Sequence, residues 1–175
     1  MQRTVIAVNC ATAAMLVTGC TAAPPPQSAP SSGAVASQAS APVATTARIH
    51  DPAALERLKN NAGVTLQWIS WTDRGTAWVR EENGTLRLTA TQSQVNGPGR
   101  LMLDGRVTEV DSDYFIFDGR ISITDTPDAE RNCTADRPDW HFAVTQNRPY
   151  WRLREFEWCD GLTDYIDIYF PGTRP

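Results

Sequence analysis

The sequence has little histidine and no excess of basic side chains. Its 175 residues include 2 His, 16 Lys and Arg and 20 Asp and Glu, which gives a formal net charge of −4. Proteins that bind the phosphate backbone of a nucleic acid carry clustered positive charge, so we do not expect a nucleic-acid partner. His141 lies within the aromatic-rich part of the chain and His50 near its start. Two distant histidines make a poor zinc site, and we expect no metal and no cofactor.

Signatures of nucleophilic catalysis are scarce as well. The Gly-x-Ser-x-Gly motif does not occur in the sequence. A triad would need a histidine beside a nucleophile, and His141, between Trp140 and Phe142, reads more readily as a partly buried strand residue. We therefore expect no nucleophilic triad.

The sequence also lacks a run of about 20 apolar residues, the length that a membrane-spanning helix needs. The apolar stretch at the N-terminus covers only residues 5–17 and contains Asn9. It follows Arg3 and a segment without acids. A short apolar core after a positive start is typical of a secretory signal peptide.

A cysteine closes this leader. The residues Val17-Thr18-Gly19-Cys20 resemble the lipobox of bacterial lipoproteins, in which an aliphatic and two small residues precede the cysteine that is acylated. The resemblance implies cleavage of signal peptide 1–19, lipidation of Cys20 by acyl chains such as palmitate, and a stable membrane anchor. The residue after Cys20 is Thr21 and not Asp. By the same resemblance, this implies release to the outer membrane, facing the periplasm. An ordinary secretory signal with an incidental Cys20 is the alternative.

The remaining cysteines then follow from this leader. Cys10 would leave with the signal peptide and Cys20 would carry lipid, so Cys133 and Cys159 would remain in an oxidising compartment. We expect them to form one disulfide, worth about 3.5 kcal/mol in the chain-entropy account. Two buried free thiols are the alternative.

Composition divides the mature chain in two. Residues 21–47 contain no charge and no aromatic side chain, whereas all six Trp lie beyond residue 48. Such a segment cannot bury enough apolar area to offset its ordering entropy. We therefore expect a disordered Ala/Pro/Ser tether at 20–47, carrying the lipidated cysteine, and a single β-rich domain at 48–175.

The domain reads as one short helix followed by strands. Asp51 and Pro52 are typical of a helix start, and Gly63 of a stop. Alternating apolar and polar residues then predict short strands at 64–69, 76–80, 86–91, 101–110, 114–124, 140–145, 150–156 and 164–170. Without a second helix, this pattern predicts a mainly β, antiparallel, curved barrel-like domain, or a sandwich.

Two copies of Asp-Gly-Arg, centred on Gly105 and Gly119, interrupt two of these strands. We interpret them as bends in long strands joined by a turn at 111–113, because glycine permits the coil that bends a sheet. The pattern over 101–124 resembles the first strands of bacterial periplasmic OB-fold domains, which implies a curved, barrel-like sheet. The segments 150–153 and 164–169 are similar to uncharacterised envelope lipoproteins and imply no function.

Acidic residues offer one candidate chemistry. A glycoside hydrolase needs two carboxyl groups held a set distance apart. Glu155, Glu157, Asp164 and Asp167 lie on two successive predicted strands. Pairing with Arg on the neighbouring strand explains them equally well.

Tryptophans offer the other candidate. Aromatic side chains at a surface stack on sugar rings or anchor protein partners. The candidate binding residues are Trp68, Trp71, Trp140, Trp151 and Trp158; the alternative is that they form the core. We expect a non-catalytic envelope lipoprotein that binds an envelope protein or glycan, with a carboxylate-dependent glycan hydrolase or a purely structural component as alternatives.

Overall fold

The computed structural model describes residues 46–174. The predicted signal peptide, Cys20 and nearly all of the predicted tether lie outside these residues, so the lipidation site and the domain boundary at residue 48 stay predictions. Within the described part of the chain, no helix is long and apolar enough to cross a membrane.

The predicted helix is present as α1 (Pro52–Lys59). The Asp51 carboxylate accepts hydrogen bonds from the backbone N–H groups of Ala53 at 2.7 Å and Ala54 at 3.2 Å. These groups have no partner within the helix, so Asp51 is the predicted N-cap. The helix ends four residues before Gly63, at the Asn60 cap.

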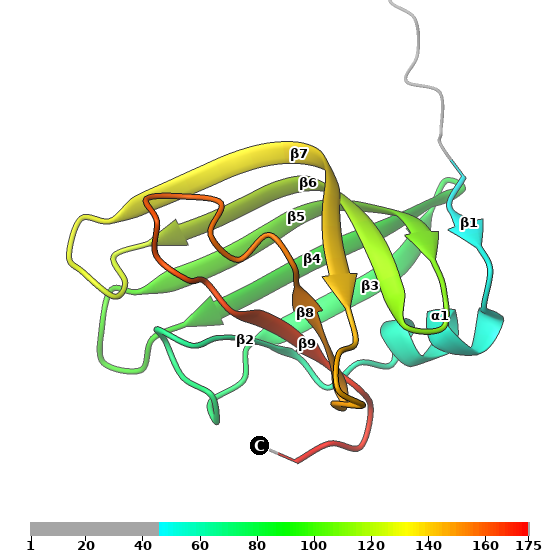
Figure 1. The fold of residues 1–175 in the computed structure, drawn as a ribbon, viewed down its shortest axis with the longest axis horizontal. Helices are drawn as coiled ribbons and strands as arrows, with labels where there is room; N and C mark the ends of the chain where they lie inside the picture. The colour runs from blue at the N-terminus through cyan, green and yellow to red at the C-terminus, as the bar shows by residue number, and fades with distance from the viewer. Residues whose placement is uncertain (1–45, 175) are drawn as a thin grey trace, which may run out of the picture. The chain divides into compact units, whose positions relative to one another are not determined.

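One sheet contains all nine strands of the described residues. The strands are β1 (Arg48–Ile49), β2 (Val64–Leu66), β3 (Thr76–Glu82), β4 (Thr85–Ser93), β5 (Arg100–Val110), β6 (Tyr114–Thr124), β7 (Asn132–Ala143), β8 (Tyr150–Leu153) and β9 (Ile166–Tyr169). Their order is β2-β9-β8-β7-β6-β5-β4-β3, and β1 pairs with β5. A bridge between Val64 and Gly75 brings the two ends of this order together. The sheet is therefore a nearly closed, mainly antiparallel barrel, as predicted (Figure 1).

The predicted bends lie side by side in the barrel wall. Gly105 of β5 and Gly119 of β6 are direct cross-strand partners. The next strand, β7, has a register shift at the same level, between the partners of Phe117 and Gly119, where its Pro138 falls. A proline cannot donate to a ladder, so a bulge accommodates it. Three neighbouring strands thus bend along one line, which lets the sheet curl into a barrel (Figure 1).

Large side chains fill the barrel. Trp140, Trp151, Phe115, Phe117 and Phe142 are the largest fully buried residues, together with Leu and Ile from β2 to β9. Phe115 stacks on Phe142 with ring centroids 4.9 Å apart. The interior is therefore a packed core, and binding surfaces must be sought on the outer wall.

Three departures from the sequence-based expectations have physical causes. β7 begins at Asn132, well before the predicted strand, because residues 132–137 pair with β6; polar residues and Pro138 conceal this strand in the sequence. β8 and β9 are shorter than predicted, since residues 154–165 leave the sheet and form a loop. The consecutive strand order also differs from the five-stranded Greek key of an OB-fold, so that resemblance extends no further than the curved hairpin.

Candidate functional site

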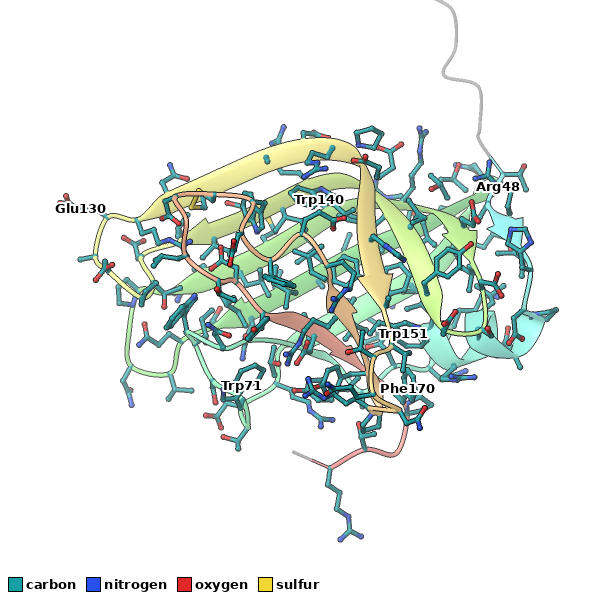
Figure 2. All side chains as sticks on the ribbon, in the orientation of Figure 1. Arg48, Trp71, Glu130, Trp140, Trp151 and Phe170 are labelled. Carbon is teal, nitrogen blue, oxygen red and sulfur yellow. A yellow bond between two sulfur atoms is a disulfide. The ribbon has the colours of Figure 1, made fainter. Side chains whose placement is uncertain are left out.

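The five candidate tryptophans separate into core and surface. Trp140 and Trp151 are 0% and 1% exposed, so no partner reaches them and they leave the candidate binding surface. The alternation of β7 and β8 points them into the barrel (Figure 2). Trp158 is half-buried and packs edge-on against Trp140, with centroids 5.3 Å apart. Trp71, at 44% exposure, is the one most open to solvent.

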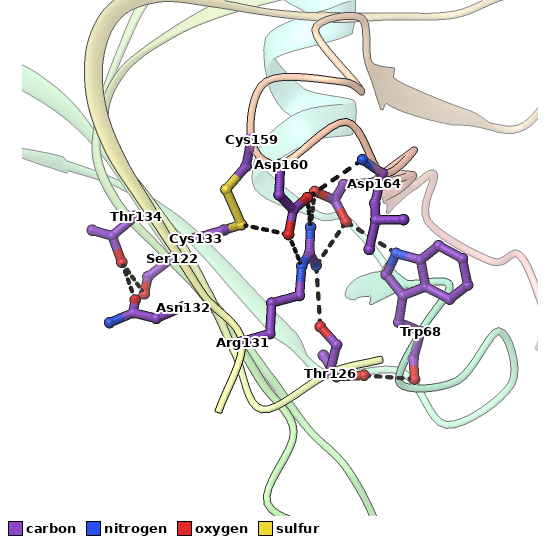
Figure 3. Close-up of a disulfide and its surroundings, with 11 residues drawn as sticks. Trp68, Ser122, Thr126, Arg131, Asn132, Cys133, Thr134, Cys159, Asp160 and Asp164 are labelled. Carbon is purple, nitrogen blue, oxygen red and sulfur yellow. Dashed lines mark hydrogen bonds and ion pairs between the residues drawn. A yellow bond between two sulfur atoms is a disulfide. The ribbon is translucent and has the colours of Figure 1, made fainter. Parts of the chain in front are cut away.

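Trp68 belongs to a buried polar network around Arg131. Its indole Nε1 donates to the Asp164 carboxylate at 3.0 Å. The Arg131 guanidinium donates to Asp164 at 2.9 and 3.1 Å and to Asp160 at 2.7 and 2.9 Å (Figure 3). The hydrogen bond with Asp160 is the largest cause of a raised pKa of the Arg131 guanidinium, and the bonds with Asp164 raise this pKa as well. Every charge in the network has a partner, which indicates a structural role.

The predicted disulfide lies beside this network. Cys133 and Cys159 are joined, with their Cα atoms 5.9 Å apart (Figure 3). Their sulfurs and the Asp160 carboxylate lie within 4.8 Å of one another, but thiolates are the metal-binding form and these sulfurs are bonded to each other. Disulfide and ion pairs together attach the loop 154–165 to the start of β7.

The second buried carboxylate, Asp167, is also paired with an arginine. Arg152 donates to it through Nε and Nη2, both at 2.7 Å. Asp167 is fully buried, and the guanidinium that it binds lies 5.6 Å from the Trp71 ring centroid and 4.1 Å from that of Tyr165. Burial raises the pKa of its carboxyl, and the hydrogen bonds from Arg152 oppose this. The Glu155 carboxylate accepts a hydrogen bond from the backbone N–H of His141 at 3.0 Å. The predicted cross-strand pairing with arginine therefore holds for Asp167.

A surface depression next to this ion pair gathers arginines. We call it the arginine hollow; its lining residues are Thr145, Gln146, Arg148, Arg152, Arg154, Phe156 and Tyr165. They come from the β7–β8 turn, from β8 and from the loop 154–165. The hollow has a volume of ≈ 400 Å³ and no acidic side chain in its lining. That size lies within the range of about 300–1,000 Å³ typical of small-molecule sites.

Aromatic rings support the guanidinium groups of this hollow. The Arg152 Cζ atom lies 4.1 Å from the Tyr165 ring centroid. Arg154 lies 5.6 Å from the Phe156 ring and Arg148 lies 6.0 Å from the Tyr150 ring. Within residues 46–174, Arg148 and Arg154 form no ion pair, whereas Arg152 is held by Asp167. Two arginines without a carboxylate partner and one fixed arginine thus converge on a single depression.

A second hollow adjoins the first and shares Arg154 and Phe156 with it. Arg137, Glu155, Glu157 and Trp158 complete its lining. Arg137 is paired with Asp139 at 3.4 Å and lies over the Trp140 ring. This neighbour mixes both signs of charge, whereas the arginine hollow has only basic and neutral side chains in its lining.

The spacing of the arginines in the sequence could have indicated that they lie on one face of the sheet. Arg148, Tyr150, Arg152 and Arg154 occupy alternate positions, and alternate residues of a strand share one face. The overall net charge of −4 gives no indication of this local cluster of arginines. Trp78 is not among the five predicted binding residues, although its side chain is 55% exposed and it alternates with the buried Val79.

Near the turn between β5 and β6, Glu109 holds the start of the described chain. Its carboxylate contacts Arg48, lies 3.3 Å from His50 and accepts a hydrogen bond from the Tyr114 hydroxyl at 2.6 Å. The bonds from Tyr114 and Arg48 lower the pKa of Glu109 from 4.5 to about 2. The same contact raises the pKa of Tyr114 to about 12. This cluster joins β1 to β5.

Comparison with known proteins gives a family and no activity. The sequence model of the PM1083 family matches residues 46–170. The chain is similar to "Uncharacterized protein PM1083" of Pasteurella multocida (strain Pm70), with 36% identity over 107 residues, 60% of this chain and 68% of that protein. No solved structure matches the chain. The match to the family begins where the described residues begin.

Proposed function

We propose that this chain, which belongs to the PM1083 family, is a lipid-anchored envelope protein whose barrel domain binds an anionic envelope component without catalysing a reaction. The arginine hollow is the observation that carries the binding proposal. The leader sequence, ending at Cys20, supports the location in the cell envelope, in the outer membrane facing the periplasm.

Charge supports an anionic ligand. Arg148, Arg152 and Arg154 line the hollow, and Asp167 is the carboxylate bonded to one of them. The three guanidinium groups outnumber the one carboxylate bonded to them, and Glu155 and Glu157 line the adjoining hollow that shares Arg154. A cationic concavity with low-dielectric walls concentrates anions from solution.

The state of the buried acids supports binding over hydrolysis. A glycan hydrolase needs an acid and a base or nucleophile that face the same bond. Asp164 and Asp167 each belong to a separate buried ion pair, with Arg131 and Arg152 respectively. Using either carboxylate as a catalyst would require breaking a pair whose loss costs about 3–5 kcal/mol.

The anchor is tested by replacing the predicted acylated residue. Cys20→Ser should move the protein from the membrane fraction to the soluble periplasmic fraction and abolish incorporation of labelled palmitate. Cys10→Ser is the matched control, because that cysteine lies inside the predicted signal peptide. A Cys20→Ser protein that still fractionates with membranes and still takes up palmitate would rule out the anchor.

Binding is tested by charge reversal in the hollow. The Arg148→Glu/Arg154→Glu double variant should lose retention on isolated envelope fragments. Arg80→Glu is the matched control: Arg80 is exposed, lies 5.0 Å from the Trp78 ring and lines a different hollow. Equal retention of the parent and both variants would overturn the proposal that the arginine hollow binds the envelope.

A further inference from the structure

The guanidinium groups of the arginine hollow lie near aromatic rings and keep N–H donors that no other described residue accepts. The Cζ atoms of Arg152, Arg154 and Arg148 lie 4.1, 5.6 and 6.0 Å from the ring centroids of Tyr165, Phe156 and Tyr150 respectively. The N–H donors of a guanidinium lie in its plane, so stacking on a ring does not consume them. The side chains of Arg148 and Arg154 donate no hydrogen bond to any of the residues 46–174, and Arg152 uses Nε and Nη2 while Nη1 has no partner there.

Edge donors arranged in this way suit oxygen anions. A guanidinium recognises carboxylate and phosphate through two parallel N–H bonds, and such charge-assisted bonds are among the strongest in proteins. Aromatic support lowers the entropy that a long arginine side chain loses on binding, because the ring already restricts it. The neutral donors and acceptors of Thr145 and Gln146 complete the lining and add no negative charge.

The local charge distinguishes between the two oxyanions. A phosphate monoester carries about −1.5 to −2 charges at pH 7 and three acceptor oxygens, whereas a carboxylate carries one charge and two oxygens. Three arginines line the hollow and one carboxylate, Asp167, is bonded to one of them, so cationic donors are in excess within its lining. Resting on the proposed binding function, we infer that the arginine hollow binds a phosphate monoester group, with Arg148 and Arg154 contacting the phosphate and Arg152 acting as a positioning residue.

The test is calorimetric titration of the purified full-length protein with four soluble probes. Glucose 6-phosphate and inorganic phosphate should bind, and glucose should not. Galacturonate, the carboxylate probe, should bind about tenfold more weakly than glucose 6-phosphate because it carries one charge fewer. Binding of galacturonate or glucose as tight as that of glucose 6-phosphate would overturn the inference.

Variants locate the site. Arg154→Glu and Arg148→Glu should each weaken glucose 6-phosphate binding by tenfold or more, and Arg80→Glu should change it less than twofold. Arg154→Lys retains charge but loses the fork, so it should weaken binding by a smaller factor; it also serves if a charge reversal impairs folding. Unchanged binding in Arg154→Glu, with a native circular dichroism spectrum, would contradict the assigned site.

Phosphate monoesters occur on sugars and on lipid headgroups, and a vesicle arm separates these sources. Vesicles of phosphatidylcholine with phosphatidic acid are compared with phosphatidylcholine alone in a flotation assay. Arg154-dependent binding to phosphatidic acid vesicles together with weak glucose 6-phosphate binding identifies a lipid headgroup, and the converse identifies a phosphorylated glycan. If neither arm shows Arg154-dependent binding while the double variant still loses envelope retention, the binding function stands and the phosphate inference falls.

Discussion

The glycine pair in the barrel wall gives the sharpest stability prediction. A Cβ atom added to Gly119 would lie 2.5 Å from the Asp104 carbonyl oxygen, 2.6 Å from the Gly105 Cα atom and 2.9 Å from the Phe117 ring. Two of these neighbours are backbone of the paired strand, and Phe117 is fully buried. A shift of the backbone atoms would disturb the sheet, and a shift of the Phe117 ring would disturb the core. We therefore expect Gly119→Ala to destabilise the protein by about 2–3 kcal/mol, the upper part of the range for overpacked cores.

Equilibrium unfolding in urea measures this change. With a slope of about 2 kcal/mol/M for a domain of this size, the midpoint should fall by roughly 1 M. Arg120→Ala is the control on the next position of β6; its side chain is 56% exposed, so its replacement should cost no more than about 0.5 kcal/mol. A Gly119→Ala loss as small as the control would show that the bend does not depend on close contact at the glycine pair.

Three further perturbations follow from the same structure. Reducing the Cys133–Cys159 disulfide, whose partners are 26 residues apart, should lower the free energy of unfolding by about 3.5 kcal/mol, measured by urea unfolding with and without reductant; an unchanged midpoint would contradict this. Arg131→Met should cost about 3–5 kcal/mol in the same assay, because it leaves the buried Asp164 carboxylate unpaired, and a loss below 1 kcal/mol would refute the network's structural role. The lowered pKa of Glu109 means that its contribution is complete above pH 4.5 and is lost as the pH falls to about 2, so the stability difference between the parent and Glu109→Gln should shrink across that window in acid titrations; a constant difference would exclude the contribution.

Local patterns predicted the architecture well where each residue had a local reason. Asp51 caps α1, Gly105 and Gly119 mark the bends, and the alternation of β5 and β6 fixes their register. Such features depend on backbone chemistry within a few residues, which a single sequence displays.

Features that depend on tertiary context were not predictable in this way. The first half of β7 turns only the small residues Cys133 and Ala135 toward the core, and it pairs with β6 over its whole length. Likewise, Trp140 and Trp151 were candidate binding residues, and only the closure of the barrel shows that their face is the interior. Sequence alternation reveals two faces of a strand but does not say which of them another layer covers.

The candidate site illustrates the same limit. The spacing of Arg148, Arg152 and Arg154 is visible in the sequence, but the sequence does not show which of them has a carboxylate partner. The assignment of Asp167 to Arg152, and the lack of an ion-pair partner for the other two within residues 46–174, required the packing of the loop 154–165 against β8.

Site-specific photo-cross-linking in intact cells tests the binding claim most directly. A benzophenone side chain is introduced at Phe156, which lines the arginine hollow, or at Trp78, which lies on the outer face of β3. Binding at the arginine hollow predicts a covalent adduct with an envelope component from position 156 that disappears in the Arg148→Glu background, and none from position 78. Adducts from position 78 alone, or an adduct at position 156 that survives the charge reversal, would contradict it.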